Sequence, residues 1–260
     1  MSGKAVSAIT IIGAGRVGWH LAHKLSNAGF TINVVWSHTY ANALELAKGV
    51  NAEATSSLDF SNSASELFIL SLADGAYRNV IDKLQLPDKA IVIHTSGSLP
   101  MEVLAPLSAT FGVFYPLQTF SREKEVLWSE IPLCLEASTP QVYNILADIA
   151  SKISSRVVPM SSEQRRKLHI AAVFACNFSN HMLAIGSTLL QRNQLPHDIL
   201  NPLIKETLEK ALAIGPKAAQ TGPARRNDQS VIQAHLRQLQ NNSEWQALYR
   251  LISEDIIKNS

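Results

Sequence analysis

Four polar residues in two stretches of the sequence could take part in the chemistry of a proton transfer to or from a small molecule. His94 and Ser96 lie in IVIHTSGSLP, and His169 and Asn177 lie in KLHIAAVFACNFSNHM. An imidazole titrates near neutral pH and serves as a general acid or base. A hydroxyl or an amide orients a substrate or stabilises developing charge. We predict catalytic roles for these four residues, with His169 as the first candidate for the proton donor and His94 as the second.

The spacing around His169 indicates a helix with a polar stripe. On a helix that turns about 100° per residue, His169, Val173, Cys176 and Asn180 fall on one stripe, and Asn177 lies about 80° to its side. Polar side chains on an apolar helix must be paired or must face a cleft. We predict that this stripe faces the substrate and that Asn180 contacts it. The alternative is a hydrogen bond between packed helices.

Three further polar residues lie in turns and could bind a substrate. Ser98 lies in HTSGSLP, Gln118 in FYPLQTF and Arg226 in TGPARRND. A guanidinium can bind a carboxylate through charge-assisted hydrogen bonds. We predict substrate-binding roles for all three residues. The alternatives are a helix cap for Ser98, a packing turn at Gln118 and a surface ion pair for Arg226.

A glycine-spaced turn near the start of the chain, GAGRVG, could hold the phosphates of a dinucleotide. The turn follows an apolar run and opens a helical stretch, which is the context that makes G-x-G-x-x-G spacing informative. The glycines permit a tight turn, close approach of the pyrophosphate and packing of the helix on the strand. Free N–H groups at the start of the helix then face the phosphates. The predicted cofactor-binding residues of this turn are Gly13, Ala14, Gly15, Arg16, Val17 and Gly18. A turn that serves packing alone is the alternative.

The end of the second apolar run bears on which cofactor is bound. NAD-binding proteins usually carry an acidic residue there, whereas this sequence has Ser37, His38 and Thr39. An acidic side chain would repel the 2′-phosphate of NADP, but hydroxyls, an imidazole and the nearby Arg16 can donate hydrogen bonds to it. We predict that these residues bind the cofactor and that NADP is preferred over NAD. For Thr39 the alternative is a helix cap.

A later turn, LADG, brings three more residues toward the cofactor. Ligands of open α/β sheets lie at the carboxyl ends of the strands. Leu72, Ala73 and Asp74 follow the apolar run ELFILSL, so we predict that they lie near the ribose or the nicotinamide. For Asp74 the alternative is a helix cap.

The elements that must position these residues change in kind along the chain. Apolar strand-like runs alternate with helical stretches up to Pro159, which is typical of a parallel sheet covered on both faces. The predicted strands span residues 7–12, 31–36, 66–72, 90–96, 111–117, 131–137 and 155–160, and the first two helices span 15–29 and 39–49. Beyond Pro159 the pattern predicts helices alone, over 161–194, 195–215, 228–240 and 243–258. We therefore predict an α/β Rossmann-type doubly wound parallel sheet over residues 1–160, followed by a smaller all-α domain over residues 161–260.

Composition and charge argue against several other classes of protein. The chain has 260 residues and a formal net charge of +2, which is small for a protein that binds nucleic acid by neutralising phosphates. The histidines and cysteines show no metal-ligand spacing, and no serine lies in a G-x-S-x-G elbow. The short basic clusters QRRKLH and ARRND are typical of helix ends or solvated faces, and could otherwise hold an anionic ligand.

Cysteine usage and apolar run lengths bear on the location of the protein. Cys134 and Cys176 lie in apolar runs without C-x-x-C spacing, which favours buried thiols in a reducing compartment. The sequence shows no signal peptide and no apolar run that we expect to span a bilayer. We predict a cytoplasmic protein without a metal site that binds neither nucleic acid nor a membrane.

Five motifs in the same order carry a resemblance to a known family. GAGRVG, HTSGSLP, FYPLQTF, HIAAVFACN and TGPARRND resemble the motifs of Rossmann-like proteins with a carboxy-terminal helical domain of unknown function. Those proteins carry the label NADP oxidoreductase without a demonstrated reaction. In plan the chain is also similar to pyrroline-5-carboxylate reductase, the deazaflavin-dependent NADP oxidoreductases and the β-hydroxyacid dehydrogenases, whose helical domain is like the carboxy-terminal domain of 6-phosphogluconate dehydrogenase. The resemblance implies an NADP cofactor, a small-molecule substrate and a homodimer formed through the helical domain.

The sequence departs from the wider relatives at the positions that carry their chemistry. In β-hydroxyacid dehydrogenases a lysine and an asparagine four residues apart on the first long helix serve catalysis. Matching the asparagine to Asn177 puts Val173 at the lysine position, so His169 is the nearest proton donor. His94 stands where those enzymes have an acidic residue, and Asn227 stands where closer relatives tend to have a glycine. The substrates of the wider relatives therefore do not transfer.

These observations together predict an oxidoreductase. We expect it to transfer a hydride between NADP(H) and a small carbonyl, hydroxy-acid or imine substrate. The alternatives are a non-catalytic NADP-binding sensor or scaffold protein, and an anion-binding protein whose glycine turn holds a different nucleotide.

Overall fold

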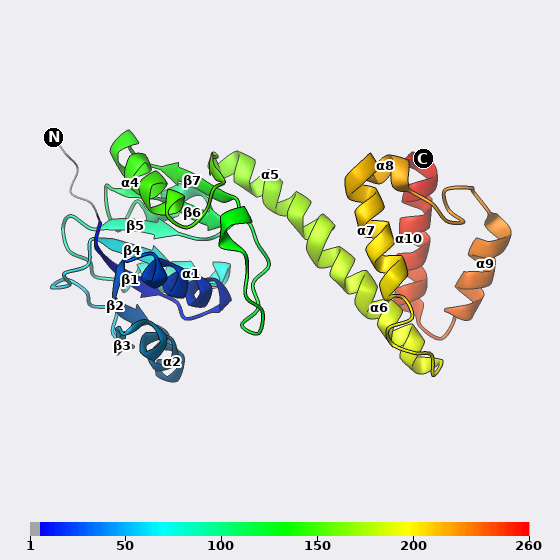
Figure 1. The fold of residues 1–260 in the computed structure, drawn as a ribbon, viewed down its shortest axis with the longest axis horizontal. Coiled ribbons are helices and arrows are strands. Elements are labelled where there is room, and N and C mark those ends of the chain that lie inside the picture. Colours follow the sequence, from blue (N-terminus) through cyan, green and yellow to red (C-terminus); the bar gives the residue numbers. More distant parts are fainter. Residues whose placement is uncertain (1–5, 260) are drawn as a thin grey trace. The chain divides into compact units, whose positions relative to one another are not determined.

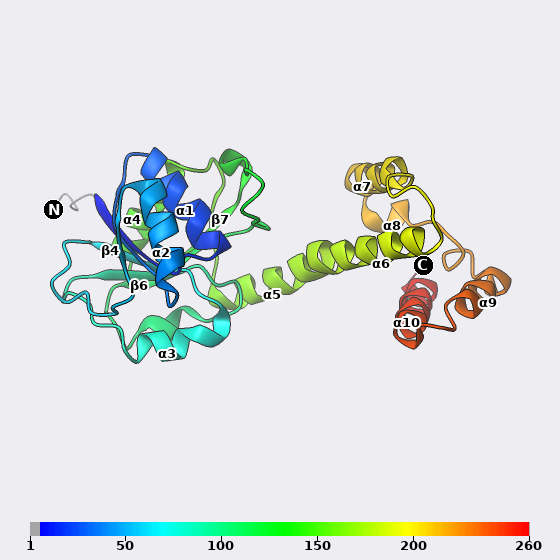
Figure 2. The same ribbon diagram turned by 90° about the horizontal axis from the view of Figure 1, so that it is seen from below.

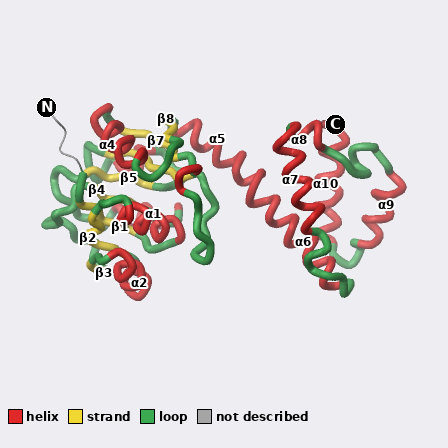
Figure 3. Tube along the Cα trace, in the orientation of Figure 1, coloured by secondary structure: helices red, strands yellow, loops and turns green. Residues whose placement is uncertain are grey.

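The structure, a computed structural model, describes residues 6–259 and divides into two compact units. The first unit, Met1–Asn180, contains the β-sheet, and the described part of the second unit, His181–Ser260, contains helices and loops alone (Figure 3). This confirms the predicted fold class, an α/β sheet followed by an all-α region.

The sheet has the strand order of a Rossmann-type fold. Its described strands are β1 (Ala8–Ile12), β2 (Thr31–Trp36), β3 (Glu53–Thr55), β4 (Leu67–Leu70), β5 (Ile91–His94), β6 (Phe111–Pro116), β7 (Leu133–Ala137) and β8 (Val157–Pro159). They lie in the order β3-β2-β1-β4-β5-β6-β7-β8. The direction of the crossovers changes between β1 and β4, which is where such sheets bind ligands.

The sheet differs from the sequence-based prediction in two details. β3 was not predicted, because its three residues are half-buried or exposed and form no apolar run. β7 lies antiparallel to β6, while the other neighbouring strands pair in parallel. An apolar run shows that a strand is buried but carries no information on its direction.

Helices cover both faces of the sheet. The α-helices of this part are α1 (Arg16–Asn27), α2 (Tyr40–Val50), α3 (Tyr77–Ile81) and α4 (Pro140–Ser151), with short 3-10 turns at Asp74–Ala76, Met101–Leu104 and Trp128–Glu130. Figure 1 shows α1, α2 and α4 along one face of the sheet, and Figure 2 shows α3 on the other. The sheet is therefore a buried layer between helices, as the near-continuous apolar runs of its strands require.

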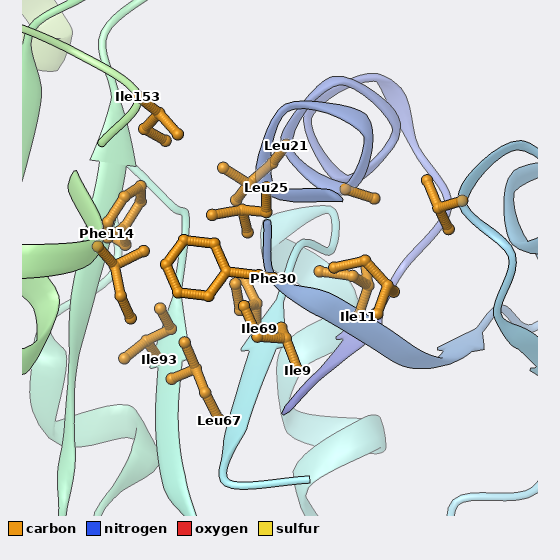
Figure 4. Packing of buried hydrophobic residues seen from close by; sticks show 14 of the residues in the cluster. Ile9, Ile11, Leu21, Leu25, Phe30, Leu67, Ile69, Ile93, Phe114 and Ile153 are labelled. Atoms are coloured by element: carbon orange, nitrogen blue, oxygen red, sulfur yellow. The ribbon is translucent and has the colours of Figure 1, made fainter. Parts of the chain in front are cut away.

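Alternate residues of each central strand enter two separate cores. In β4, Leu67 and Ile69 belong to the core under α1, α2 and α4, whereas Phe68 and Leu70 belong to the core under α3. Phe30 lies in the middle of the first core (Figure 4). Because successive side chains of a strand point to opposite faces, each four-residue run supplies both cores.

The glycine turn after β1 is held in place by close backbone contacts. Gly13 has a φ of +117°, and a Cβ atom there would lie 2.1 Å from the carbonyl oxygen of Ser71. A Cβ atom at Gly18 would lie 2.0 Å from the carbonyl oxygen of Gly13. These two glycines let α1 and the end of β4 pack directly on the turn.

Three consecutive helical segments follow the last strand. They are α5 (Ser162–Ala172), a π-helical segment (Val173–Phe178) and α6 (Ser179–Arg192). α5 starts with a capping box between Ser161 and Gln164. The sequence SSEQ predicts a serine cap at Ser161 or Ser162, and the structure has it at Ser161. π-helical segments are rare and are frequent at functional sites.

One of our expectations about these segments is wrong. Together they form a helix, Ser162–Arg192, that is long and apolar enough to cross a membrane by length and composition, although we expected no such run. Neither criterion takes account of where the helix packs, so a single helix that meets them is weak evidence for a membrane span.

The second unit is built around few buried side chains. Its remaining helices are α7 (Asn201–Ile214), α8 (Pro216–Ala219), α9 (Gln229–Gln238) and α10 (Ser243–Asn259). The predicted helix over 195–215 begins only at Asn201, because Leu195 and Pro196 have no regular structure and 197–200 form a turn. Asp228 caps α9 by accepting from the Val231 N–H at 3.2 Å, as its position suggests.

Candidate active site at the carboxyl edge of the sheet

A pocket of about 390 Å³ opens where β1, β4, β5 and β6 end. The turns that follow these strands form its walls, and the side chain of His169 from α5 completes it. Its lining residues are Gly15, Arg16, Val17, Ser71, Leu72, Ala73, Asp74, Thr95, Ser96, Gly97, Tyr115, Pro116, Gln118 and His169. Nine of the residues that the sequence singles out therefore line one space within the first unit.

The start of α1 forms one wall, and its geometry suits a phosphate group. Gly15 is the N-cap, and no side chain caps the helix, so the first N–H groups of α1 are not used by a side chain. A Cβ atom at Gly15 would meet no atom within 4 Å, which means that the space beside it is open. N–H groups at such a helix start bind anions, and Arg16 adds positive charge. These residues fit the pyrophosphate of a dinucleotide.

The end of β2 lies beside this turn. The Gly13 N–H donates to the carbonyl oxygen of Trp36 at 2.8 Å, so that Ser37, His38 and Thr39 follow next to the glycines. Thr39 is the N-cap residue of α2, but its hydroxyl makes no capping hydrogen bond. All three side chains are exposed or half-buried and can donate to a ligand.

Asp74 joins the two loops that follow β4 and β5. Its Oδ1 accepts from the hydroxyl of Ser96 at 2.8 Å, and its Oδ2 accepts from the hydroxyl of Ser98. The Ser96 oxygen also accepts from the N–H groups of Ser98 and Leu99, each at 3.1 Å. Asp74 therefore crosslinks the floor of the pocket and places one carboxylate there, while Ala73 is the cap of the short 3-10 turn.

His94 lies beneath the pocket and is fully buried. Its Nδ1 accepts from the Ser96 N–H at 3.1 Å, and its Nε2 has no hydrogen-bond partner among the described residues. Burial, and then the positive charge of Arg165, lower the pKa of His94 to about 4. The ring is therefore uncharged at neutral pH and has no exposed surface toward the pocket.

His169 lines the pocket and is held by two contacts. Its Nδ1 lies 3.2 Å from the hydroxyl of Tyr115, and the two rings meet edge to face with centroids 6.3 Å apart. At the same edge of the ring, a Cβ atom at Gly97 would lie 2.6 Å from the same Nδ1. The absence of a side chain at Gly97 thus lets the His169 ring lie against the loop after β5.

A buried ion pair fixes the start of α5, one turn before His169. Arg165 is fully buried and donates to Oε2 of Glu136 at 2.6 Å and to the carbonyl oxygen of Leu99 at 2.5 Å. The hydroxyl of Ser162 also donates to Glu136, and it accepts from the N–H of Met101 at 2.9 Å. These bonds join α5 to β7 and to the loop after β5.

The protonation of Glu136 follows from these contacts. Burial raises the pKa of its carboxyl group, but hydrogen bonds from Ser162 and Arg165 outweigh burial and leave the pKa below its usual value. Glu136 is therefore ionised at neutral pH and balances the charge of Arg165.

Several predicted residues lie outside this pocket. Asn177, Asn180 and Cys176 are exposed, so the expectation of a buried thiol is wrong for Cys176 and holds for Cys134. The π-helical segment has wider turns than an α-helix and breaks the stripe that we extrapolated from His169. Arg226 belongs to the second unit, where its side chain is exposed. The described residues contain no cluster of three or more His, Cys, Asp or Glu side chains suited to a metal ion.

Sequence reasoning missed two groups of site residues. Tyr115 was read as part of an apolar run, although a tyrosine at the end of a strand is a usable signal because its hydroxyl needs a partner. Arg165 was read as part of a solvated basic cluster, and no local signal could have shown that its partner is Glu136, 29 residues earlier.

The fold and the site define a class of protein before any comparison. A doubly wound sheet, a glycine turn that opens an uncapped helix at the switch point, and a polar pocket over it define a Rossmann-type dinucleotide-binding domain, here followed by a helical domain. In agreement, the profile of a Rossmann-like domain matches residues 3–118, and that of a domain of unknown function (DUF2520) matches residues 131–256.

Solved structures identify the family. The chain is 44% identical to a Bacteroides fragilis protein whose crystal structure is described as that of a "putative NADP oxidoreductase"; the match covers 97% of this chain and 98% of that one, with a TM-score of 0.93. The chain therefore belongs to the family of proteins that join a Rossmann-like domain to a DUF2520 domain. No curated protein sequence matches it.

More distant structures share the fold alone. A Thermotoga maritima protein is 20% identical over 96% of this chain and 97% of that one, with a TM-score of 0.68. A reductive aminase from Aspergillus terreus, in complex with NADPH and ethyl levulinate, is 14% identical over 99% of this chain and 95% of that one, with a TM-score of 0.73.

Proposed function

We propose that this protein is an NADP-dependent oxidoreductase that transfers a hydride between NADP(H) and a small carbonyl, hydroxy-acid or imine substrate. The observation that carries the proposal is one pocket lined both by the uncapped start of α1 and by the titratable side chain of His169. The name of the 44% identical Bacteroides fragilis protein and the NADPH in the reductive aminase complex support the choice of cofactor.

The cofactor would be held by three segments of the chain. NADPH supplies the hydride when it is bound. The N–H groups at Gly15, Arg16 and Val17 would bind its pyrophosphate, with Gly13, Ala14 and Gly18 shaping the turn. Ser37, His38 and Thr39 would bind the 2′-phosphate, since none of them is acidic. Leu72, Ala73 and Asp74 would lie against the sugar and the nicotinamide.

The substrate would lie between the loop after β5 and α5. We propose His169 as the proton donor because its ring lines the pocket, whereas His94 is buried beneath it. Ser96 and Ser98 hold the Asp74 carboxylate in place, and Gln118 lines the pocket with a side chain amide that can bind a substrate. The catalytic role of Asn177 and the substrate-binding roles of Asn180 and Arg226 stay predictions, and all three side chains are exposed.

We propose a homodimer formed through a helical domain that spans residues 161–260. The second unit exposes large apolar side chains, Leu212 above all at 88%, which a second copy could cover. We also propose a cytoplasmic location, since neither cysteine is in a disulfide in the structure.

The first experiment measures cofactor binding and then turnover. NADPH and NADH are titrated by fluorescence, and tighter binding of NADPH is expected. Small keto acids, ketones and cyclic imines are then screened for NADPH oxidation. His169→Gln is expected to lower kcat about 10²- to 10⁴-fold, which is the usual contribution of a general acid, and to leave NADPH binding unchanged.

Matched variants separate the alternatives. His197→Gln, at an exposed position of the second unit, serves as the control and is expected to have no effect. Tight NADPH binding without turnover of any substrate would favour the sensor. Binding of neither nucleotide at millimolar concentration would exclude both the reductase and the sensor. Turnover that survives in His169→Gln would remove His169 from the role of donor.

A further inference from the structure

Among the described residues, two histidine–tyrosine pairs bring a tyrosine hydroxyl within hydrogen-bond distance of a histidine Nδ1. In the first unit the hydroxyl of Tyr115 lies 3.2 Å from Nδ1 of His169, and in the second unit the hydroxyl of Tyr249 lies 2.8 Å from Nδ1 of His235. Both ring pairs meet edge to face, at 77° and 81°. Of these four rings, those of Tyr115 and His169 line the polar pocket at the edge of the sheet.

The surroundings of His169 occupy one edge of its ring. Tyr115 bonds Nδ1, and Gly97 lies so close to Nδ1 and Cγ that a Cβ atom there would be 2.6 Å and 2.9 Å from them. Nε2 lies on the opposite edge of an imidazole ring, and no hydrogen bond to it is present among the described residues. The bonded edge thus faces the loop and Tyr115, and Nε2 is the nitrogen left for a ligand in the pocket.

A hydroxyl suits this place because its oxygen can serve both charge states of the ring. It can accept from the Nδ1–H that the ring carries both as the imidazolium and as the neutral Nδ1–H tautomer. Tyr115 keeps its proton, since burial raises the pKa of its hydroxyl. The same contact therefore holds the ring whether it is neutral or protonated.

We propose that Tyr115 is a positioning residue that commits Nδ1 of His169 and thereby makes Nε2 the nitrogen that exchanges a proton with the substrate. The last clause rests on the proposed function. In the reducing direction the Nε2–H bond of the imidazolium breaks and its electron pair stays on the ring. The proton goes to the substrate oxygen or nitrogen whose neighbouring carbon receives the hydride, and the neutral ring keeps its Nδ1–H on the oxygen of Tyr115. Solvent then returns a proton to Nε2.

The kinetic test uses Tyr115→Phe in the full chain, which keeps the ring and removes the hydroxyl. We expect kcat to fall about ten- to hundredfold, as for a misplaced catalytic group, with KM and NADPH binding unchanged. In a His169→Gln background the same change is expected to have no further effect, because Tyr115 acts through the ring. An equal loss of kcat in that background, or a rise in KM alone, would show that Tyr115 contacts the substrate itself and would overturn the proposal.

A spectroscopic test needs no activity. In protein labelled with ¹⁵N-histidine, a hydrogen-bonded Nδ1–H exchanges slowly enough to give a cross-peak. Tyr115→Phe is expected to remove the His169 signal, assigned by its loss in His169→Gln, and to leave that of His235. The matched variant Tyr249→Phe is expected to do the reverse.

The two tests fail in distinguishable ways. If wild type turns over no substrate, the proposed function fails, and the spectra still decide whether Tyr115 holds Nδ1. If wild type is active and the His169 signal persists in Tyr115→Phe, the proposed function stands and the role of Tyr115 is wrong.

Discussion

The two units differ in how much of their apolar surface the chain itself covers. The sheet unit buries two cores on opposite faces of its strands. Among the described residues of the helical unit, the buried apolar side chains are Leu190, Ala224, Ile232 and Leu236, while Leu203, Leu208 and Leu212 are more than half exposed. Small cores stabilise a unit weakly, so the helical unit depends more on what covers it.

The candidate site belongs to the sheet unit. Its pocket carries a carboxylate, a guanidinium, an imidazole and a phenol beside the glycine turn. In the helical unit, a pocket of about 310 Å³ next to Trp245 and Leu248 has no charged residue in its lining, whereas one of about 650 Å³ includes Lys217, Arg225 and Asp255. The site with the glycine turn thus lies on the part of the chain whose core is complete, where rigid neighbours fix it. Substitutions in the sheet unit should change stability and chemistry, and those in the helical unit should change assembly.

The largest effect is expected from Glu136→Ala, which leaves the buried Arg165 without its partner. Removing one member of a buried pair destabilises a protein by about 3–5 kcal/mol. The control is Glu163→Ala, which removes the exposed partner of Lys167 at i+4 and should change stability by less than about 0.5 kcal/mol. Urea unfolding followed by far-UV circular dichroism measures both, and equal small effects would show that the pair does not hold α5.

Alanine substitutions at two glycines of the same turn should have different effects, one on the stability of the protein and the other on NADPH binding. Gly13→Ala brings Cβ to 2.1 Å from the carbonyl oxygen of Ser71 at a φ of +117°, so we expect a loss of about 3 kcal/mol or more. Gly15→Ala meets no atom within 4 Å and is expected to keep the melting temperature while weakening NADPH binding about tenfold, because the methyl group occupies the space for the phosphates. Thermal melts and fluorescence titration check this pair, and unchanged binding in Gly15→Ala would count against the site.

A fall in pH should lower the free energy of unfolding of the sheet unit, because His94 is buried in its uncharged form. Its pKa is lowered from 6.5 to about 4 in the folded protein, so the unfolded chain binds the extra proton between these values. Stability is therefore lost as the pH falls from about 6.5 to about 4, by about 3 kcal/mol in total. His94→Gln is expected to flatten this part of the pH profile of unfolding, whereas the exposed His197→Gln should leave it unchanged. A profile that is the same in all three proteins would contradict the assignment.

Local patterns in the sequence predicted most of the sheet unit and, within its site, the glycine turn. The glycine turn, the apolar strands and the serine cap of α5 each depend on residues close together in the chain, so their spacing carries the signal. The pairs Arg165–Glu136 and His169–Tyr115 join residues 29 and 54 positions apart. No periodicity predicts such contacts, because they follow from the order and direction of the strands.

The position of Asn177 shows a second limit of the sequence. A helix wheel of constant turn placed it beside the stripe of His169, but the π-helical segment Val173–Phe178 changes the turn between them. The i→i+5 hydrogen bonds of such a segment are made by the backbone and leave no mark in residue type. The cap of α5 at Ser161 could be predicted from the residue types of SSEQ, because there the side chains themselves make the bonds.

The smallest effect on unfolding is expected from Leu212→Lys, although it should change the assembly most. Leu212 is 88% exposed in the helical unit, so a charge there costs the isolated chain little, within about 0.5 kcal/mol. If a second copy covers this side chain, the buried ammonium opposes association, and light scattering should show a dimer for wild type and a monomer for the variant. Leu127→Lys, at a 62% exposed position of the sheet unit, is the matched control and should remain a dimer. A wild-type protein of monomer mass would contradict the dimer, and the thin core of the helical unit would then have to be sufficient by itself.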